Sequence, residues 1–299
     1  MRSASRVLAG VLATALAGAA ATGAPARHPT AASRIENRSA TVHGLKIHYL
    51  EAGYGQPLVL LHGLGGSAES MKPLVAVLAR RHHVYAPDQI GFGGSDKPLI
   101  DYRITTLVDF LHGFFATLGI ERADLVGHAV GARVASLYAL EHPERIGRLV
   151  LISGAGYRPD LDEEAERALT FATLADARRA LTLAYADDGR ATQAAAERLF
   201  STRLKSGSAW TVARLVESFR SGEGWADDLS PIQAPTLIVW GRDDELAKVG
   251  VAERAHRQIR GSRLVLLDHC GHLPLEEQPK ALESALTSFL DPVAGPASR

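Results

Sequence analysis

The chain has 299 residues, and its 33 basic side chains balance 33 acidic ones, so its formal net charge is zero at pH 7. A chain without net charge has no overall field that attracts nucleic acid or acidic lipid, and no nucleic-acid motif occurs in it. The single cysteine, Cys270, excludes an internal disulfide. We expect a small-molecule partner and no nucleic-acid partner, and the sequence specifies no oligomeric state.

The first segment has the features of an export signal. Two arginines precede an apolar run over residues 7–21, which is shorter than the ~20 apolar residues of a membrane-spanning helix. We expect residues 1–33 to be a signal peptide with a linker, and the mature protein to be secreted or periplasmic without stable membrane insertion. Cleavage after Ala21 or after the Ala-Pro-Ala tripeptide at 24–26 stays open. An uncleaved N-terminus that anchors the protein to the membrane is the alternative.

Strands and helices alternate along most of the remaining chain. Alternating and continuous apolar runs predict strands over 39–43, 45–51, 58–61, 83–87, 123–126, 148–152, 236–239 and 263–267. Helical spacing of apolar residues predicts helices over 70–80, 106–118, 133–140 and 279–290. The first two strands form a hairpin around Gly44, and the others belong to βαβ units with a parallel sheet. Functional residues should then lie at the carboxyl ends of the strands.

The strand pattern is interrupted once. Over residues 157–229 alanine, leucine, glutamate and arginine recur at helical spacing. We interpret this segment as a helical cap inserted between two parts of one core, residues 34–156 and 230–291. Residues 292–299 are rich in Pro, Gly and Ser and are expected to form a flexible tail.

One turn between a strand and a helix is the most informative feature of the sequence. Gly127 and Gly131 flank Ala129 at two positions on each side. This spacing is that of the G-x-S-x-G nucleophile elbow, in which a strained turn exposes one side chain. Alanine has no nucleophilic atom, so the motif has lost its reactive group.

Five motifs in order resemble those of the α/β-hydrolase superfamily over 35–290. They are His62-Gly63, the Gly-rich segment 91–96, the elbow, Trp-Gly-Arg-Asp-Asp at 240–244, and Gly-His at 271–272. The resemblance implies a mostly parallel eight-stranded sheet flanked by helices, with an inserted helical cap.

The resemblance also implies roles for particular residues. The general base maps onto His272, and the acid that orients it maps onto Asp244, with the adjacent Asp243 as the competing choice. The oxyanion hole would come from the backbone N–H groups of Leu64 and Val130. These donors do not depend on a serine.

Other reactive side chains are expected to be structural. Ser95 belongs to a structural loop of the family, His269 lacks the family's Gly-His context, and Cys270 is expected to be a buried, inert thiol. No dinucleotide fingerprint and no metal-ligand spacing occurs, so neither a cofactor nor a metal is expected.

Ala129 leaves the chemistry open among three explanations. They are an engineered replacement of serine, a natural enzyme that works through His272 and Asp244 without a nucleophile, and a binding protein that has lost catalysis. Haloalkane dehalogenases, which resemble the chain in their cap, have aspartate at the elbow, so that class is excluded. We expect a hydrolase of a small ester, thioester, lactone or other carbonyl substrate, with a ligand-binding pseudoenzyme as the alternative.

Overall fold

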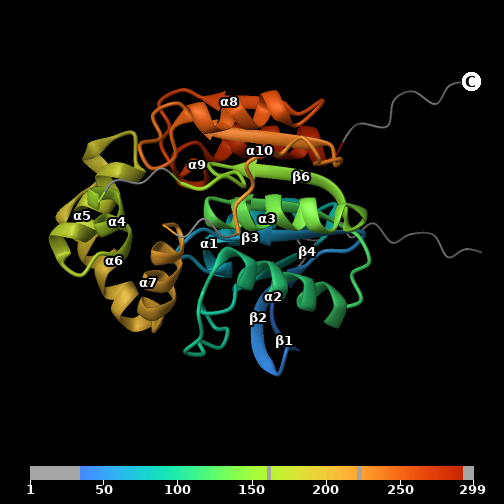
Figure 1. Ribbon diagram of the computed structural model, residues 1–299, viewed down its shortest axis with the longest axis horizontal. Coiled ribbons are helices and arrows are strands. Elements are labelled where there is room, and N and C mark those ends of the chain that lie inside the picture. Colours follow the sequence, from blue (N-terminus) through green and yellow to red (C-terminus); the bar gives the residue numbers. More distant parts are fainter. Residues whose placement is uncertain (1–33, 160–162, 221–223, 292–299) are drawn as a thin grey trace, which may run out of the picture. The chain divides into compact units, whose positions relative to one another are not determined.

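The computed structural model describes residues 34–159, 163–220 and 224–291 (Figure 1). The expected signal peptide and linker (1–33) and the expected tail (292–299) lie outside the described residues. Within these ranges, no helix is both long and apolar enough to cross a membrane.

The described residues form one eight-stranded sheet. Its strands are β1 (Glu36–Val42), β2 (Leu45–Ala52), β3 (Gln56–Leu61), β4 (His82–Pro87), β5 (Ala123–His128), β6 (Ile146–Ile152), β7 (Thr236–Gly241) and β8 (Arg263–Leu267). They lie in the order β1-β2-β4-β3-β5-β6-β7-β8. β2 pairs antiparallel with β1 and β4, and all other neighbours are parallel. The predicted eight-stranded, mostly parallel sheet is confirmed.

The strand sequences match their places in the sheet. Every residue of β5 and β7 is buried, as expected for central parallel strands covered on both faces. β1 lies at the edge, and its first four residues are exposed or half-buried.

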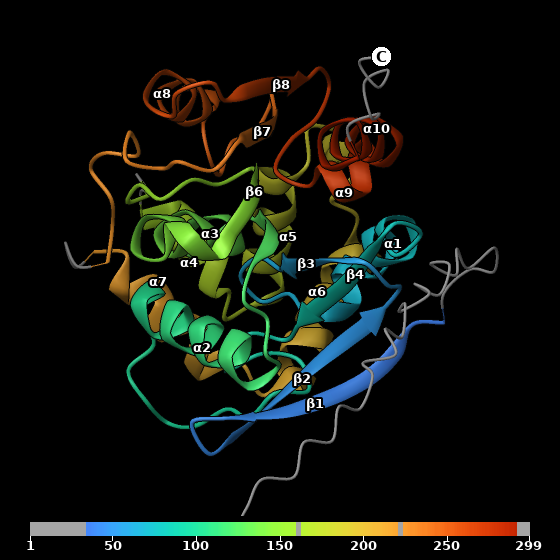
Figure 2. The same cartoon turned by 90° about the vertical axis from the view of Figure 1, so that its right-hand side faces the viewer.

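Helices cover both faces of the sheet (Figure 2). One face packs against α1 (Ala68–Leu78) and α10 (Pro279–Leu290), with the short α9 (Pro274–Glu277) leading into α10. The other face packs against α2 (Ile104–Thr117), α3 (Val130–Glu141) and α8 (Val249–Gln258). A 3₁₀ turn, η1 (Pro143–Arg145), connects α3 to β6.

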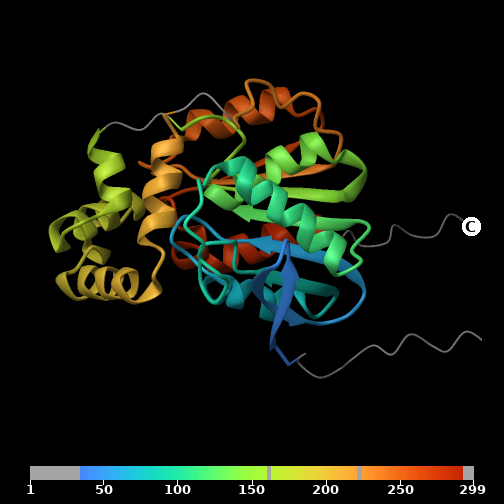
Figure 3. The same cartoon turned by 60° about the horizontal axis from the view of Figure 1, so that its bottom comes forward.

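Among the described residues of the segment predicted to be the cap, four α-helices follow β6, and Figures 1 and 3 show them beyond one end of the sheet. They are α4 (Glu163–Thr170), α5 (Leu174–Ala184), α6 (Gln193–Ser206) and α7 (Ala209–Ser218), with a 3₁₀ turn, η2 (Asp188–Arg190), before α6. Thr173 and Asp176 form a capping box at the start of α5. Gly207 ends α6 with a φ of 67°, a left-handed conformation that glycine adopts without strain.

The sequence patterns missed α8, a ten-residue helix of the core. Its last turn carries His256 and Arg257, only Ala252 and Ala255 are buried, and Gly250 lies inside it. Two small alanines give too weak an apolar stripe for periodicity to detect. The parallel pairing of β7 and β8 nevertheless requires a crossover, which α8 supplies.

The strand order reverses direction next to β3. From β3 the chain first adds β4 on one side and then returns to add β5 on the other. In open α/β sheets a ligand crevice forms at such a reversal, outside the carboxyl ends of the strands. The turn after β3 and the elbow after β5 therefore lie on the two sides of this crevice.

Candidate active site

The elbow is a strained turn between β5 and α3. Ala129 has φ 51° and ψ −112°, which is an unfavourable conformation for a residue with a side chain and costs of order 1–3 kcal/mol. Its N–H donates to the carbonyl of Ile152 (2.9 Å), and its own carbonyl accepts from Arg133 N–H (3.2 Å). These bonds hold the alanine between strand and helix.

The elbow glycines are required by close backbone contacts. A Cβ added at Gly127 would lie 2.3 Å from the carbonyl oxygen of Gly131, and one added at Gly131 would lie 2.4 Å from that of Leu61. Neither contact leaves room for a methyl group. The glycines therefore bring β5, α3 and β3 together at this point.

The turn after β3 lies directly against the elbow. A Cβ added at Gly63 would lie 3.2 Å from the Cβ of Ala129. Buried His62 holds this turn: its Nδ1–H donates to the carbonyl of Gly63 (2.8 Å), and its Nε2 accepts from Gln89 N–H (3.1 Å). Burial lowers the pKa of His62, which favours the neutral ring that this pattern needs.

Two backbone N–H groups at this junction have no acceptor. They belong to Leu64, in the turn after β3, and to Val130, the first residue of α3, and no described residue accepts a hydrogen bond from either. Unpaired backbone donors are rare in folded proteins unless a ligand or water meets them. Their placement fits the predicted oxyanion hole.

His272 and Asp244 meet at the carboxyl ends of β8 and β7. His272 Nδ1 lies 2.8 Å from Asp244 Oδ2, and the side chain of Asp244 is fully buried. The other carboxylate oxygen, Oδ1, accepts the N–H groups of Leu246 (3.0 Å) and Ala247 (2.8 Å). The carboxylate is thus fixed, and it orients the imidazole so that Nε2 is available to a ligand.

The loop that carries His272 is bonded to the cap. His272 N–H donates to the carbonyl of Ala184, the last residue of α5 (2.7 Å). Glu277 accepts from Gly271 N–H (3.0 Å) and Leu273 N–H (3.2 Å) with one oxygen, and from Ala186 N–H (2.9 Å) with the other. One half-buried carboxylate side chain, that of Glu277, therefore connects the histidine loop to the end of α5.

A second histidine supports the first. His128, the residue before Ala129, donates its Nε2–H to the carbonyl of His272 (2.9 Å). Burial, and then the nearby His272, lower the pKa of His128 to about 4. The ring is therefore neutral at pH 7 and acts as a fixed donor to the His272 backbone.

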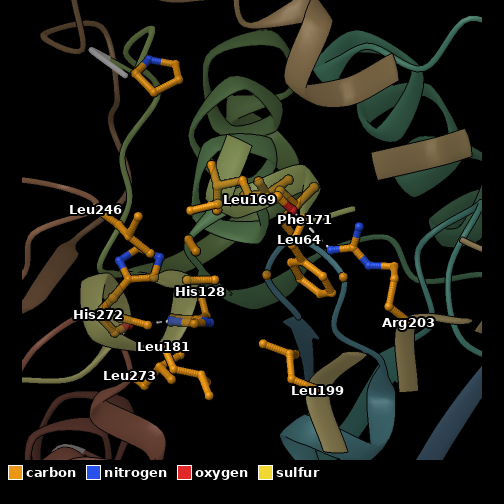
Figure 4. Close-up of a pocket in the computed structure, with 18 of the residues that line it drawn as sticks. Leu64, His128, Leu169, Phe171, Leu181, Leu199, Arg203, Leu246, His272 and Leu273 are labelled. Carbon is orange, nitrogen blue, oxygen red and sulfur yellow. Dashed lines mark hydrogen bonds between the residues drawn. The ribbon is translucent and has the colours of Figure 1, made fainter. Parts of the chain in front are cut away.

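A pocket of about 210 Å³ connects these groups with the cap (Figure 4). Gly63, Leu64, His128, Ala129 and His272 line it from the core. From the cap it is lined mainly by apolar side chains, which are Ala168, Leu169, Phe171, Ala180, Leu181, Ala184, Leu199 and Phe219. The arrangement suits a small, mostly apolar molecule with one polar group at the elbow.

Two arginines line the same pocket, and no described acidic residue does. Arg133 lies on α3, one turn after Ala129. Arg203 lies on α6, across the pocket from His272 in Figure 4. Burial lowers the pKa of each to about 10, so both remain cationic at pH 7.

The alternatives to the mapped residues lie elsewhere. Asp243 and His269 have exposed side chains. Ser95 is buried in a structural network, donating to the Asp88 carbonyl (2.6 Å) and accepting from His48 N–H (2.9 Å). Cys270 is fully buried, and burial raises its thiol pKa to about 12, so it is not a ready nucleophile.

Three site residues escaped the sequence analysis: His128, Arg133 and Arg203. The sequence could have indicated Arg133 as a site residue, because a residue four positions after the elbow lies on the same helix face as the elbow. Arg203 lies on a cap helix whose orientation the sequence does not specify. Nowhere in the described ranges do three or more His, Cys, Asp or Glu side chains form a group that could hold a metal.

Comparisons with known proteins show which proteins the chain resembles. A 2-hydroxy-6-oxo-6-(2'-aminophenyl)hexa-2,4-dienoic acid hydrolase of Metapseudomonas resinovorans is 28% identical over 266 residues, covering 86% of this chain and 92% of that protein. Among solved structures, a bacterial membrane phospholipase A is similar, with a TM-score of 0.75 and 30% identity, covering 86% of each chain.

A second solved structure is a serine-to-alanine mutant of the meta-cleavage product hydrolase CumD from Pseudomonas fluorescens IP01, complexed with acetates. Its TM-score is 0.78 at 27% identity, covering 85% of this chain and 97% of that one. The family model described as alpha/beta hydrolase fold matches residues 56–279. The chain thus belongs to the α/β-hydrolase fold family.

Proposed function

We propose that the protein hydrolyses a small ester, thioester, lactone or other carbonyl compound without forming a covalent acyl-enzyme. The observation that carries the proposal is the His272–Asp244 pair, which faces the same pocket as two unpaired backbone donors and Ala129. The proposal assigns His272 as the base and the two backbone donors as the oxyanion hole, next to a position that has no nucleophile. Water is then the attacking group.

The reaction can be written for an ester with all atoms accounted for. Water attacks the carbonyl carbon while His272 Nε2 takes its proton, and Asp244 stabilises the imidazolium. The resulting oxyanion accepts hydrogen bonds from the N–H groups of Leu64 and Val130. The C–O bond then breaks, the imidazolium protonates the leaving oxygen, and an acid and an alcohol are released.

The relatives support this substrate class. The curated relative is named as a hydrolase of an oxo-dienoic acid, and one structural neighbour is a meta-cleavage product hydrolase. Both names describe hydrolases, and the first one names an oxo-acid substrate. The proposal transfers that reaction class to this chain, not their individual substrates.

The test compares hydrolysis by three variants with that by the native protein. We expect His272→Ala and Asp244→Asn each to lower the rate on p-nitrophenyl acetate or a simple lactone by about 100-fold, since general-base catalysis contributes ~10²- to 10⁴-fold. His269→Ala, which removes the exposed histidine three residues earlier, is the matched control and should keep the native rate. Mass spectrometry during turnover should detect no acyl adduct. Equal rates for the native protein and His272→Ala would refute the mechanism.

The second candidate is a ligand-binding protein without turnover, and Ala129 is the observation that favours it. Saturable binding of a carbonyl ligand, with no hydrolysis of it by the native protein, would support this alternative.

We also propose that the first segment directs export of the protein and is then cleaved off. The two arginines and the apolar run over residues 7–21 support the proposal. Expression of the full chain with a C-terminal tag, followed by fractionation and N-terminal sequencing, tests it. A mature N-terminus near residues 22–27 in the periplasm or medium is expected. An intact N-terminus in the membrane fraction would instead support the anchored form.

A further inference from the structure

Arg133 is a buried cation to which the described part of the chain offers no partner. Only 8% of the residue is exposed, and its Nε has no hydrogen-bond acceptor. Among the described residues no carboxylate forms an ion pair with it. The negative charge that acts on it is that of Asp244, whose oxygens are already bonded to His272, Leu246 and Ala247.

Arg203 offers an internal contrast, because it lines the same pocket and has partners. Its Nη2 donates to the carbonyl of Leu169 (3.1 Å) and its Nη1 to that of Thr170 (3.4 Å), at the end of α4. Its guanidinium also lies 4.0 Å from the centre of the Phe171 ring. These contacts explain Arg203 as a residue that joins two cap helices. No comparable contact explains Arg133.

A buried charge without a counter-charge is rare, because leaving water is costly unless a partner compensates. The side chain of Arg133 borders the pocket, so a bound anion can supply that partner. We propose that Arg133 is the anion-binding residue of the pocket and that the substrate is a carbonyl compound that also carries a carboxylate. This inference rests on the proposed hydrolysis for its reacting carbonyl.

The surroundings favour a carboxylate over a phosphate. Arg133 brings one positive charge and a planar fork that matches a carboxylate. A dianionic phosphate would need further donors, but the pocket is lined mainly by apolar side chains, such as Leu169, Phe219 and Leu246.

The position of Arg133 also limits the ligand's shape. Its backbone N–H bonds to the carbonyl of Ala129, so it lies one helical turn from the elbow. A ligand whose carboxylate meets the guanidinium can place its reacting carbonyl between Leu64 and Val130 only if a few bonds separate the two groups. Short-chain half-esters of dicarboxylic acids and keto acids satisfy this condition.

The test measures binding, using the full chain and an isosteric pair of probes. Isothermal titration with phenylacetate and with neutral phenylacetamide gives the carboxylate preference, and phenyl phosphate tests the other anion. We expect the native protein to prefer phenylacetate by about 10-fold or more, since bonds to charged groups are the stronger ones. Arg133→Met should reduce the ratio to about one, while Arg203→Met should keep it. Thermal unfolding of each variant checks that it is folded.

Several results would overturn the inference. They are an unchanged ratio in folded Arg133→Met, loss of the ratio in Arg203→Met alone, or tighter binding of phenyl phosphate than of phenylacetate. Because binding is measured without turnover, failure of the proposed hydrolysis is a separate result. A protein that binds phenylacetate through Arg133 but hydrolyses no ester would keep this inference and refute the mechanism.

Discussion

The two walls of the pocket are built in different ways. The core wall, which carries the elbow, is held by close backbone contacts. The carbonyl of Gly131 leaves no room for a side chain at Gly127, and the carbonyl of Leu61 leaves none at Gly131. The cap wall consists of side chains on separate helices, with a small apolar cluster of Leu181, Ala191 and Ala196. The comparison teaches that the position of reacting groups depends on the backbone. The choice of ligand depends on replaceable side chains.

This difference can be tested most directly at an elbow glycine. Gly127→Ala should lower the free energy of unfolding by at least about 3 kcal/mol, because the new Cβ would lie 2.3 Å from a backbone oxygen that cannot move alone. Gly250→Ala is the matched control, since a Cβ there meets nothing within 4 Å inside α8. It should raise stability by up to about 1 kcal/mol. Urea unfolding measures both. A loss below 1 kcal/mol at Gly127 would show that the core wall adapts as easily as the cap.

His128 makes the core wall sensitive to acid. Its pKa is lowered to about 4 in the folded protein from an ordinary value of 6.5. As the pH falls, the unfolded chain therefore takes up a proton on this histidine before the folded protein does. The contribution of His128 to stability is complete above pH 6.5 and is lost progressively between pH 6.5 and pH 4. The loss from this residue amounts to up to about 3 kcal/mol.

His128→Gln checks this contribution, because its Nε2 can still donate to the His272 carbonyl while the group no longer titrates. Urea unfolding at pH 7 and pH 4 should show a smaller difference in the variant than in the native protein. Identical differences would mean that His128 does not contribute to the acid lability.

Restoring the hydroxyl tests whether the core wall still has catalytic geometry. Ala129→Ser should raise p-nitrophenyl acetate hydrolysis by about 100-fold or more, since His272 and the backbone donors then have a nucleophile to activate. Fluorophosphonate should label the variant and not the native protein. Adding His272→Ala should remove the gain.

A folded Ala129→Ser protein no faster than the native one would mean that the base or the oxyanion donors are misplaced. Stoichiometric labelling of the native protein at Ser95 or Ser67 would reveal a displaced nucleophile.

The smallest effect is expected in the cap. Leu181→Ala removes a side chain that lines the pocket and is 8% exposed, and it should cost about 2 kcal/mol of stability. In the Ala129→Ser background, Leu181→Ala should raise KM while kcat changes less than threefold. The substitution removes binding that is equal in the ground state and the transition state, and it leaves His272 untouched. A large fall in kcat with constant KM would show that the cap wall also positions the reacting groups.

The sequence predicted the core wall better than the cap wall, for a physical reason. Glycine spacing around Ala129 and the Gly-His pair at 271–272 reflect close backbone contacts, so they mark positions directly. The confirmed sheet follows from apolar strand runs of the same kind. The direction in which Arg203 or Phe171 points depends on how cap helices pack together, which periodicity does not encode. Helix α8 was missed because its buried stripe consists of only two alanines.

The bonds between the His272 loop and the end of α5 have a consequence for motion. A rigid swing of α5 away from the sheet would break the bond between His272 N–H and the Ala184 carbonyl and the bond between Ala186 N–H and Glu277. Opening on that side would therefore disorder His272 together with the cap. Ligand exchange is expected to use another border of the pocket, near α7, while α5 stays docked. Amide hydrogen exchange should then be slower at His272 than in α7, and Glu277→Gln should accelerate it at both His272 and Ala186.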